Sequence, residues 1–462
     1  MQQDMSPEEF RRAGHEVVDW IAAYLENIRE YPVVTRHRPG DLIDGLPTSG
    51  PESGESMDKI LADFREQVVP DLTHWNHPRF FGYFSVSASG PGILGEMLVA
   101  ALNVNGMLWK SCPAATELEQ VTLEWLRQWI GLPEGMFGII YDTASVSTMH
   151  AIAAAREAAF PEVRTNGGLA GAILYTSEQA HSSIEKGAIT LGIGQRNVRL
   201  IPVDDRFRMR TDLLAAAIDD DRRAGRKPFC ICATVGTTST SSIDPVPAIA
   251  DIAEREKLWL HVDAAYGGSA AIVPEMQYVL AGAERADSVL LNPHKWLFTP
   301  IDISVLYTRK PEILRRAFSL IPEYLRTEED SRAVNYMDYG FQLGRRFRAL
   351  KFWFVMRYFG RDGIIAVLRE HIRLAQELAG WVQLDPRFEL AAPTPFSLVC
   401  FRLKESDASN RELLDAVNAS GKAFLSHTVL NGKFALRFAI GNVKTTQDDI
   451  AETWELIQRL SA

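Results

Sequence analysis

Two apolar runs, WLHVDAAY (259–266) and SVLLNPHKW (288–296), decide the fold of this chain. Both are short, rich in valine and leucine, and bounded by glycine and proline, which is typical of buried strands in a parallel sheet. Ligands bind beyond the carboxyl ends of such strands. The first run ends on Asp263 and the second delivers Lys295, so we expect both side chains to face one pocket.

An acid and an amine at neighbouring strand ends permit two interpretations. The simpler one is a structural salt bridge. The other is that both side chains address pyridoxal phosphate, whose aldehyde forms a Schiff base with a lysine and whose ring nitrogen needs an acid partner to stay protonated. The second interpretation requires a phosphate-binding loop and a ring-stacking group elsewhere in the chain.

Length and composition narrow the class of protein. The 462 residues exceed the size of a single core, so we expect two or three domains that share a pocket. Hydrophobic and charged contents of 46% and 23% are those of an ordinary globular enzyme, and the net charge of −10 argues against a nucleic-acid partner. We expect no signal peptide and no membrane span. The four cysteines lack metal or redox spacing, which favours a cytoplasmic setting without a metal site.

A phosphate-binding loop is predicted at FGIIYDTASVS (137–147). A short apolar run turns there through small hydroxyl residues into a helix expected over 148–160. Backbone amides at a helix N-terminus, with hydroxyls beside them, form an anion site. Ordinary N-capping by Thr143 or Ser145 is the alternative. The chain has neither a glycine-rich dinucleotide fingerprint nor a GxxxxGK[ST] loop at this position, which argues against nucleotides.

Two more predicted strands, 172–175 and 229–235, are each followed by polar residues. His181 follows the first and Thr238 follows the second. A lone histidine is either a satisfied structural residue or a group that stacks on a cofactor ring. Right-handed crossovers place all these strand ends on one edge of a sheet. The sequence therefore predicts an α/β layer from about 135 to 310 with one polar pocket.

Segments along nearly the whole chain resemble the group II pyridoxal-phosphate decarboxylases, most closely the aromatic L-amino-acid decarboxylases. The resemblance implies a fold-type I enzyme, with a mainly parallel seven-stranded sheet between helices. It also implies an N-terminal helical segment (1–88, packing on a second subunit), a large domain (89–356) and a small C-terminal α+β domain (357–462). The matching segments are HPRFFGYF (77–84), SCPAATELE (111–119), YDTASVST (141–148), SEQAHSS (177–183), VGTT (235–238), HVDAAYGGSA (261–270), NPHKW (292–296), LGRRFRALKFWFV (343–355) and LRFAI (436–440).

The same resemblance implies roles for single residues. Lys295 matches the Schiff-base lysine and Asp263 matches the partner of the pyridine nitrogen. His181 and Ala265 match the two faces around the ring. An acidic residue often follows the loop serine in this family, whereas this chain has Val146 there. This departure affects the assignment of the phosphate contacts but not that of the cofactor. The other cofactor-binding positions are Thr143, Ala144, Ser145, Thr238, Asn292 and His294.

A mobile lid is expected at about 319–340, because this segment is polar and lacks periodicity. Within it, Tyr336 lies seven residues before Leu343, at the spacing of the family's catalytic tyrosine. A phenol on a closing loop can protonate the product carbon and exclude water. The alternative is an exposed loop aromatic. Relatives that form aldehydes replace this tyrosine or the stacking histidine, so Tyr336 and His181 favour an amine and CO₂ as products.

The expected substrate is an aromatic L-amino acid: tyrosine, phenylalanine, tryptophan or dihydroxyphenylalanine. The alternatives are an aromatic aldehyde synthase, a decarboxylase of a non-aromatic amino acid, an aminotransferase or carbon–sulfur lyase, and a non-catalytic homologue. The resemblance implies a homodimer with active sites at its interface. Arg437 either reaches the site or forms a structural ion pair. The predicted substrate-binding residues are Trp75, Tyr83, Phe84, Val86 and Gly344.

Overall fold

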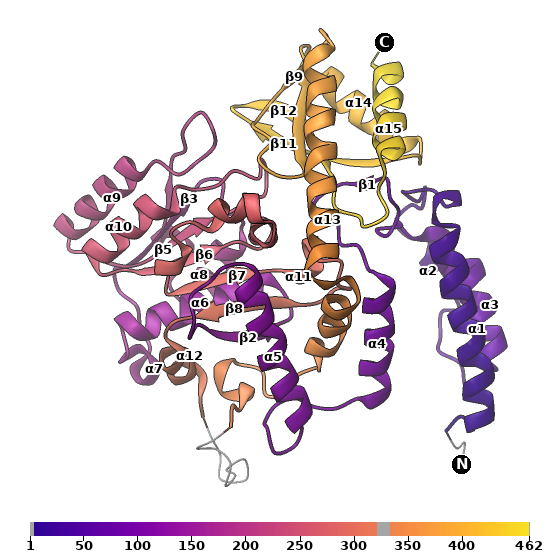
Figure 1. Ribbon diagram of the computed structural model, residues 1–462, viewed down its shortest axis with the longest axis horizontal. Helices are drawn as coiled ribbons and strands as arrows, with labels where there is room; N and C mark the ends of the chain where they lie inside the picture. The colour runs from indigo at the N-terminus through magenta and orange to yellow at the C-terminus, as the bar shows by residue number, and fades with distance from the viewer. Residues whose placement is uncertain (1–3, 321–332, 462) are drawn as a thin grey trace.

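The computed structural model describes residues 4–320 and 333–461, and its large domain is built on one seven-stranded sheet (Figure 1). The strand order is β2-β8-β7-β6-β5-β3-β4. Only β8 runs antiparallel to its neighbours, which confirms the predicted mainly parallel sheet. The strands are β2 (Phe137–Tyr141), β3 (Ala172–Ser177), β4 (Val198–Ile201), β5 (Lys227–Thr234), β6 (Trp259–Asp263), β7 (Ser288–Leu291) and β8 (Ser304–Thr308).

Helices cover both faces of this sheet because alternate strand residues point to opposite sides. Leu174, Leu290 and Leu306 pack with one set of helices, whereas Val262 and Val289 pack with the other. The central strands β6 and β7 are buried along their whole length. The first set is α6 (Ala144–Ala159), α8 (Ser183–Thr190) and α12 (Pro311–Phe318); the second includes α5 (Pro113–Trp129), α9 (Thr211–Arg223) and α10 (Val246–Glu256).

The small domain has a second sheet with the order β1-β11-β12-β10-β9. Its first strand comes from the N-terminal part of the chain and pairs in parallel with β11. The long helix α13 (Arg348–Leu384) joins the two domains and breaks at Gly360, where φ is 62°, just beyond the predicted boundary at 356–357. The other elements are β1 (Phe80–Phe81), β9 (Phe388–Leu390), β10 (Leu398–Leu403), β11 (Phe424–Leu430), β12 (Lys433–Ala439), α14 (Asp407–Ala419) and α15 (Gln447–Leu460).

The N-terminal helices α1 (Pro7–Glu26), α2 (Asp41–Gly45) and α3 (Met57–Asp63) stand at the side of the molecule (Figure 1). Ser6 caps α1 by accepting the Glu9 N–H, and Pro7 occupies the first turn. Phe10 on α1 is 67% exposed. Helix α4 (Gly90–Leu102) returns the chain to the large domain. Within the described ranges, no helix combines the length and apolarity that crossing a bilayer requires.

Candidate active site

The turn after β7 is tied to the end of β6, which brings Asp263 and Lys295 to one place. The Asn292 N–H donates to the Ala265 carbonyl at 3.1 Å, and the Lys295 N–H donates to the Asn292 carbonyl at 3.0 Å. Asp263 accepts the Ala265 N–H at 3.0 Å and is nearly buried. Both side chains therefore occupy the carboxyl edge of the sheet, as predicted.

The Lys295 amine lies in an apolar setting. Its Nζ is 5.3 Å from the centre of the Phe84 ring, and among the described residues it has no carboxylate in ion-pair contact. Burial lowers the pKa of Lys295, the charge of Asp263 raises it, and the nearby guanidinium of Arg437 lowers it. Among the described residues, Asp263 and Lys295 form no direct salt bridge, so the simpler interpretation does not hold. The amine is thus closer to its reactive, uncharged form.

His181 joins this pair from the end of β3. Burial and the Lys295 charge lower the pKa of His181, and Asp263 raises it. Its Nδ1 accepts the Ser183 N–H at 3.1 Å, so in the neutral ring the proton resides on Nε2. The three predicted residues form one electrostatic cluster from three strand ends, although they are far apart in sequence.

The predicted phosphate loop opens a helix at the same edge. Helix α6 begins at Ala144, earlier than predicted, so Ala144 and Ser145 lie in its first turn. Thr143 does not cap the helix; its N–H and hydroxyl both point to the Asp142 carboxylate, at 2.5 and 3.1 Å. The N-capping alternative therefore does not hold for Thr143. The helix start, without an acidic residue in its first turn, remains available to an anion.

Arg437 on β12 closes the site from the small domain, a role that the sequence left open. Its guanidinium donates to the Thr238 carbonyl at 2.7 Å, the Ser239 carbonyl at 3.1 Å and the Ser426 hydroxyl at 2.8 Å. It is 4% exposed and lies 5.4 Å from the Phe84 ring centre. Within residues 4–320 and 333–461 it has no carboxylate partner, so the predicted ion pair is absent there. Arg437 instead fixes the loop that carries Thr238.

The aromatic segment before β1 divides between two surroundings. Phe84 stacks on Tyr266 at 4.0 Å and faces Lys295. Trp75 and Tyr83 stack on each other at 5.6 Å beside the small sheet, where Tyr83 also contacts Phe424. The positive φ of Tyr83, 52°, turns the chain between these two groups. The half-buried Val86 follows Phe84. The structure therefore brings Phe84 to Lys295 and leaves Trp75 and Tyr83 largely exposed.

Gly344 lies beside Asn105, on the far side of β8 from Lys295. A Cβ at Gly344 would lie 3.8 Å from the Asn105 amide nitrogen, and Asn105 accepts the Arg345 N–H at 2.9 Å. Arg345 in turn donates to the Ile140 carbonyl of β2 at 2.8 Å. Because β8 separates β2 from β7, Gly344 borders the edge of the sheet rather than its centre.

Tyr336, the predicted catalytic tyrosine, is enclosed in this structure. Its ring is 1% exposed, packs near Phe137, and lies 4.4 Å from the Arg345 guanidinium. Burial holds the pKa of this phenol well above its usual value, and among the described residues the hydroxyl has no hydrogen-bond partner. A proton donor must reach the reacting carbon, so the predicted role requires this segment to move when a ligand binds. Of the predicted lid at 319–340, residues 333–340 form a bend and a buried 3₁₀ turn, and residues 321–332 lie outside the described residues.

These surroundings fit pyridoxal phosphate. The cluster holds two basic side chains, Lys295 and Arg437, beside the carboxylate of Asp263. Among the described residues, two buried polar atoms, Thr234 Oγ1 and Asn292 Oδ1, have no partner. Basic side chains near a helix N-terminus favour an anionic ligand, and the unpartnered atoms leave room for further polar contacts. The free amine and the carboxylate at neighbouring strand ends match the aldehyde and ring nitrogen of this cofactor.

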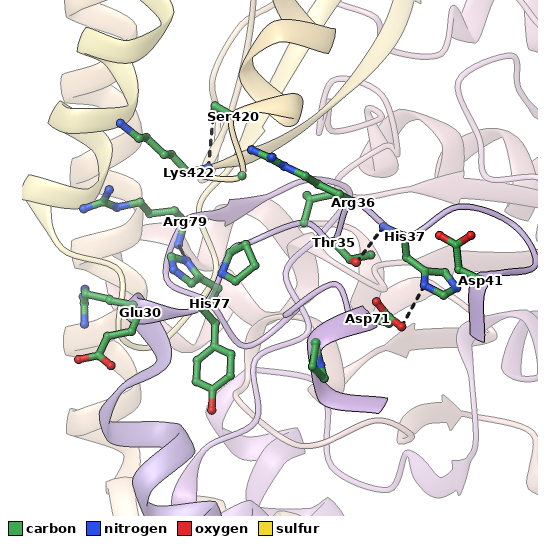
Figure 2. A pocket seen from close by; sticks show the side chains of 16 residues that line it. Glu30, Thr35, Arg36, His37, Asp41, Asp71, His77, Arg79, Ser420 and Lys422 are labelled. Atoms are coloured by element: carbon green, nitrogen blue, oxygen red, sulfur yellow. Dashed lines mark hydrogen bonds and ion pairs between the residues drawn. The ribbon is translucent and has the colours of Figure 1, made fainter. Parts of the chain in front are cut away.

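A cavity of about 750 Å³ lies elsewhere, between the N-terminal segment and the loop at 420–422 (Figure 2). Its wall carries charged groups such as Arg36, His37 and Lys422. His37 is held by Asp71 at 3.0 Å, and none of the predicted site residues lines this space.

Comparisons with known proteins agree with the geometry. The model of the pyridoxal-dependent decarboxylase conserved domain matches residues 39–404. Phenylacetaldehyde synthase of Arabidopsis thaliana is 41% identical over 98% of this chain and 96% of its own length. Tyrosine decarboxylase 4 of Petroselinum crispum is 40% identical over 98% of this chain and 93% of its own.

A solved structure of Oryza sativa TDC with PLP and tryptamine superposes with a TM-score of 0.97. It is 36% identical and covers 100% of this chain and 99% of that one. The cofactor predicted from the strand ends is therefore the cofactor of the family. This chain belongs to the pyridoxal-dependent decarboxylases, within the aromatic L-amino-acid decarboxylase family.

Proposed function

We propose that this protein removes the α-carboxylate of an aromatic L-amino acid and releases the amine and CO₂. The observation that carries the proposal is the cluster of His181, Asp263 and Lys295, with the Phe84 ring against the lysine. The aromatic side is supported by relatives whose names specify tyrosine and by a similar structure that holds tryptamine. Phe84 offers a flat apolar wall of the kind that aromatic ligands need.

Each residue of the site has a defined task in this proposal. When bound, pyridoxal phosphate supplies an electron sink for the bond that is broken. Asp263 would hold the proton of the ring nitrogen, and Lys295 would hold the aldehyde carbon. His181 and Ala265 would face the ring, with the Thr238 loop beside it. The residues that would hold the phosphate are Thr143, Ala144, Ser145, Asn292 and His294.

His181 acts as a hydrogen-bond donor rather than as a base. Its Nδ1 lone pair is occupied by the Ser183 N–H, so protonation of the ring would break that bond. Burial already lowers its pKa, which keeps the ring neutral at physiological pH. The Nε2–H would therefore be the donor that His181 offers to an oxygen of a bound ligand. This leaves the proton that replaces CO₂ to a different group.

The substrate pocket is completed, in this proposal, by a second copy of the chain. Gly344 and Asn105 border the outer part of the sheet, and Trp75 and Tyr83 stack beside the small sheet, so of the predicted substrate residues it is Phe84 whose ring faces Lys295. The side-standing helices α1–α3, with exposed Phe10, provide an apolar surface for a homodimer. The four free cysteines support a cytoplasmic setting.

Formation of an aromatic aldehyde is the second candidate. It is favoured by the 41% identity to phenylacetaldehyde synthase. Against it stands Tyr336, which aldehyde-forming relatives typically replace with phenylalanine. His181, which aldehyde-forming relatives often replace, still favours the amine.

The test is product analysis with purified protein loaded with pyridoxal phosphate. Tryptophan, tyrosine, phenylalanine and dihydroxyphenylalanine are supplied separately, and amine, CO₂, aldehyde, ammonia and peroxide are measured. The proposal expects equal amounts of amine and CO₂ without peroxide. Aldehyde with matching peroxide would establish the second candidate, and no product from any aromatic substrate would overturn both. Lys295→Ala serves as the control for uncatalysed reaction.

A further inference from the structure

Three aromatic rings form a stack beside Lys295. Phe84 stacks on Tyr266 with ring centres 4.0 Å and planes 19° apart, and Tyr266 stacks on Trp296 at 4.8 Å and 18°. The Phe84 ring at one end faces the Lys295 amine. Trp296 at the other end directly follows the lysine and closes the short helix α11 (Pro293–Trp296). The stack therefore runs from the residue after the lysine to the ring that faces its amine.

The Trp296 end of the stack is fixed by His371 on α13. The indole Nε1–H donates to His371 Nδ1 at 3.0 Å, and both side chains are buried. An indole N–H can only donate, so Nδ1 accepts and the neutral ring carries its hydrogen on Nε2. That Nε2–H donates to the Asn442 carbonyl at 3.0 Å. Burial lowers the pKa of His371 to about 4, although the Asn442 carbonyl and the Glu370 charge oppose this effect. The ring is therefore neutral at physiological pH, with one nitrogen committed to each partner.

The Phe84 end is tied to the same histidine through the small domain. Asn442 lies after β12, and its side-chain amide donates to the Asn76 carbonyl at 2.8 Å. The Asn76 side-chain oxygen accepts the Ala88 N–H at 2.8 Å. Asn76 and Ala88 lie on either side of Phe84 in the chain, so this bond closes the loop that carries the ring. His371 thus bonds to the ring at one end of the stack and, through Asn442, to the segment that carries the ring at the other.

We propose that His371 is a positioning residue, which holds the Phe84 ring against the Lys295 amine. Phe84 has no polar atom, so its position depends on packing and on the hydrogen bonds of its neighbours. An imidazole accepts at one nitrogen and donates at the other, whereas an apolar side chain in its place would remove the acceptor of the Trp296 N–H. The inference goes beyond the proposed function, because it needs only the family's cofactor at Lys295 and holds for any substrate.

The experiment measures access to Lys295 without any amino acid present, so its result is independent of the products that the protein forms. Protein loaded with pyridoxal phosphate is treated with borohydride, and the rate of its absorbance change reports how readily the reductant reaches the bond between cofactor and lysine. His371→Leu is expected to be reduced roughly 5- to 10-fold faster than the wild type, because the loss of one ordinary hydrogen bond raises the open population by about that factor.

His371→Gln tests whether the hydrogen bonds or the bulk of the ring matter. Its side chain can accept from Trp296 and donate to Asn442, so its reduction rate is expected to stay within about twofold of the wild type. An unchanged rate in His371→Leu, or a rate in His371→Gln as fast as that of His371→Leu, would overturn the proposal.

Asn410→Leu is the matched control. Asn410 lies on α14 in the small domain, is also buried, and is also hydrogen-bonded at both ends of its side chain, to Leu403 and Ser406. Its substitution is expected to lower the free energy of unfolding in urea and to leave the reduction rate at the wild-type value. An equal acceleration in this variant would mean that any loss of stability in the small domain exposes Lys295, and would overturn the proposal.

Phe84→Ala decides whether the effect passes through the ring. This variant is itself expected to be reduced faster than the wild type, and the addition of His371→Leu is expected to bring no further acceleration. A further acceleration in the double variant would show that His371 acts on Lys295 by another route, and would overturn its assigned role. If His371→Leu fails to fold, Asn76→Ala takes its place with the same expected direction, because it removes the Ala88 bond and leaves α13 intact.

Discussion

Two enclosed lysines in this protein have opposite surroundings. Lys351 on α13 is 1% exposed and forms an ion pair with Glu96 of α4, with the two atoms 2.8 Å apart. Lys295 follows β7 and, among the described residues, has no carboxylate in contact, only the charge of Asp263 nearby. Burial lowers the pKa of both amines, but the hydrogen bond to Glu96 opposes this effect by raising the pKa of Lys351.

The difference separates structural from chemical use of the same side chain. A buried amine that is paired holds two helices together; removal of Lys351 would leave Glu96 only its more exposed partner, Arg346. A buried amine that is unpaired has a desolvation penalty that no ion pair compensates, and such groups concentrate at functional sites. Burial alone would not distinguish the two lysines; their partners do.

The largest expected effect is that of Lys295→Ala on activity. Decarboxylation is expected to fall on the order of 10⁴-fold or more, as when other covalent catalytic groups are removed. The free energy of unfolding of the apo-protein is expected to stay equal or rise, because a desolvated charge is removed. Product assays and urea denaturation measure the two quantities. Retained turnover would assign the chemistry to a different amine.

Asp263→Asn is expected to lower the rate roughly 10²- to 10⁴-fold, the range for a group that holds a proton during catalysis. Asp263 raises the pKa of Lys295, so its neutralisation lowers that pKa further. The pH at which the absorbance of the cofactor-loaded protein changes is therefore expected to move downward. A shift in the upward direction would show that Asp263 does not act on Lys295.

Lys351→Met is expected to reverse the pattern of Lys295→Ala. The free energy of unfolding is expected to fall by about 2–4 kcal/mol, because Glu96 loses its most buried partner. Turnover per folded molecule is expected to stay within about twofold of the wild type. Lys351→Met combined with Glu96→Gln is expected to recover part of the stability in urea denaturation. A loss of turnover without a loss of stability would erase the distinction between the two lysines.

Tyr336→Phe is expected to have the smallest effect. Among the described residues its buried hydroxyl has no partner. Its removal is therefore expected to leave the free energy of unfolding unchanged or to raise it by less than about 1 kcal/mol. The ratio of amine to aldehyde is expected to stay the same. Diversion of product toward aldehyde and peroxide in this variant would instead support the catalytic role predicted from sequence, with the phenol leaving its enclosure during turnover.

The sheet and its polar edge could be predicted because they depend on local patterns. Apolar runs that end in Asp263 or lead to Lys295 identify strands, and the topology of α/β layers then places their ends together. The convergence of His181 with these two residues follows from the same rule. No contact between distant segments had to be known.

The placements that local patterns could not supply depend on long-range packing. The composition of 319–340 suggested a lid, but Tyr336 is enclosed by Phe137 and Arg345, which no local pattern reveals. Likewise, the aromatic segment gave no sign that Phe84 would face Lys295 while Tyr83 turns away through a positive φ. Arg437 remained ambiguous because its carbonyl partners belong to another domain.

The most direct test asks which amine carries the cofactor. Protein loaded with pyridoxal phosphate is reduced with borohydride, digested, and mapped by mass spectrometry. The label is expected on the peptide that contains Lys295, and it is expected to vanish in Lys295→Ala while persisting in Lys351→Met. A label on Lys351 or on another lysine, or no label in the wild type, would contradict the assignment of the unpaired amine as the chemical one.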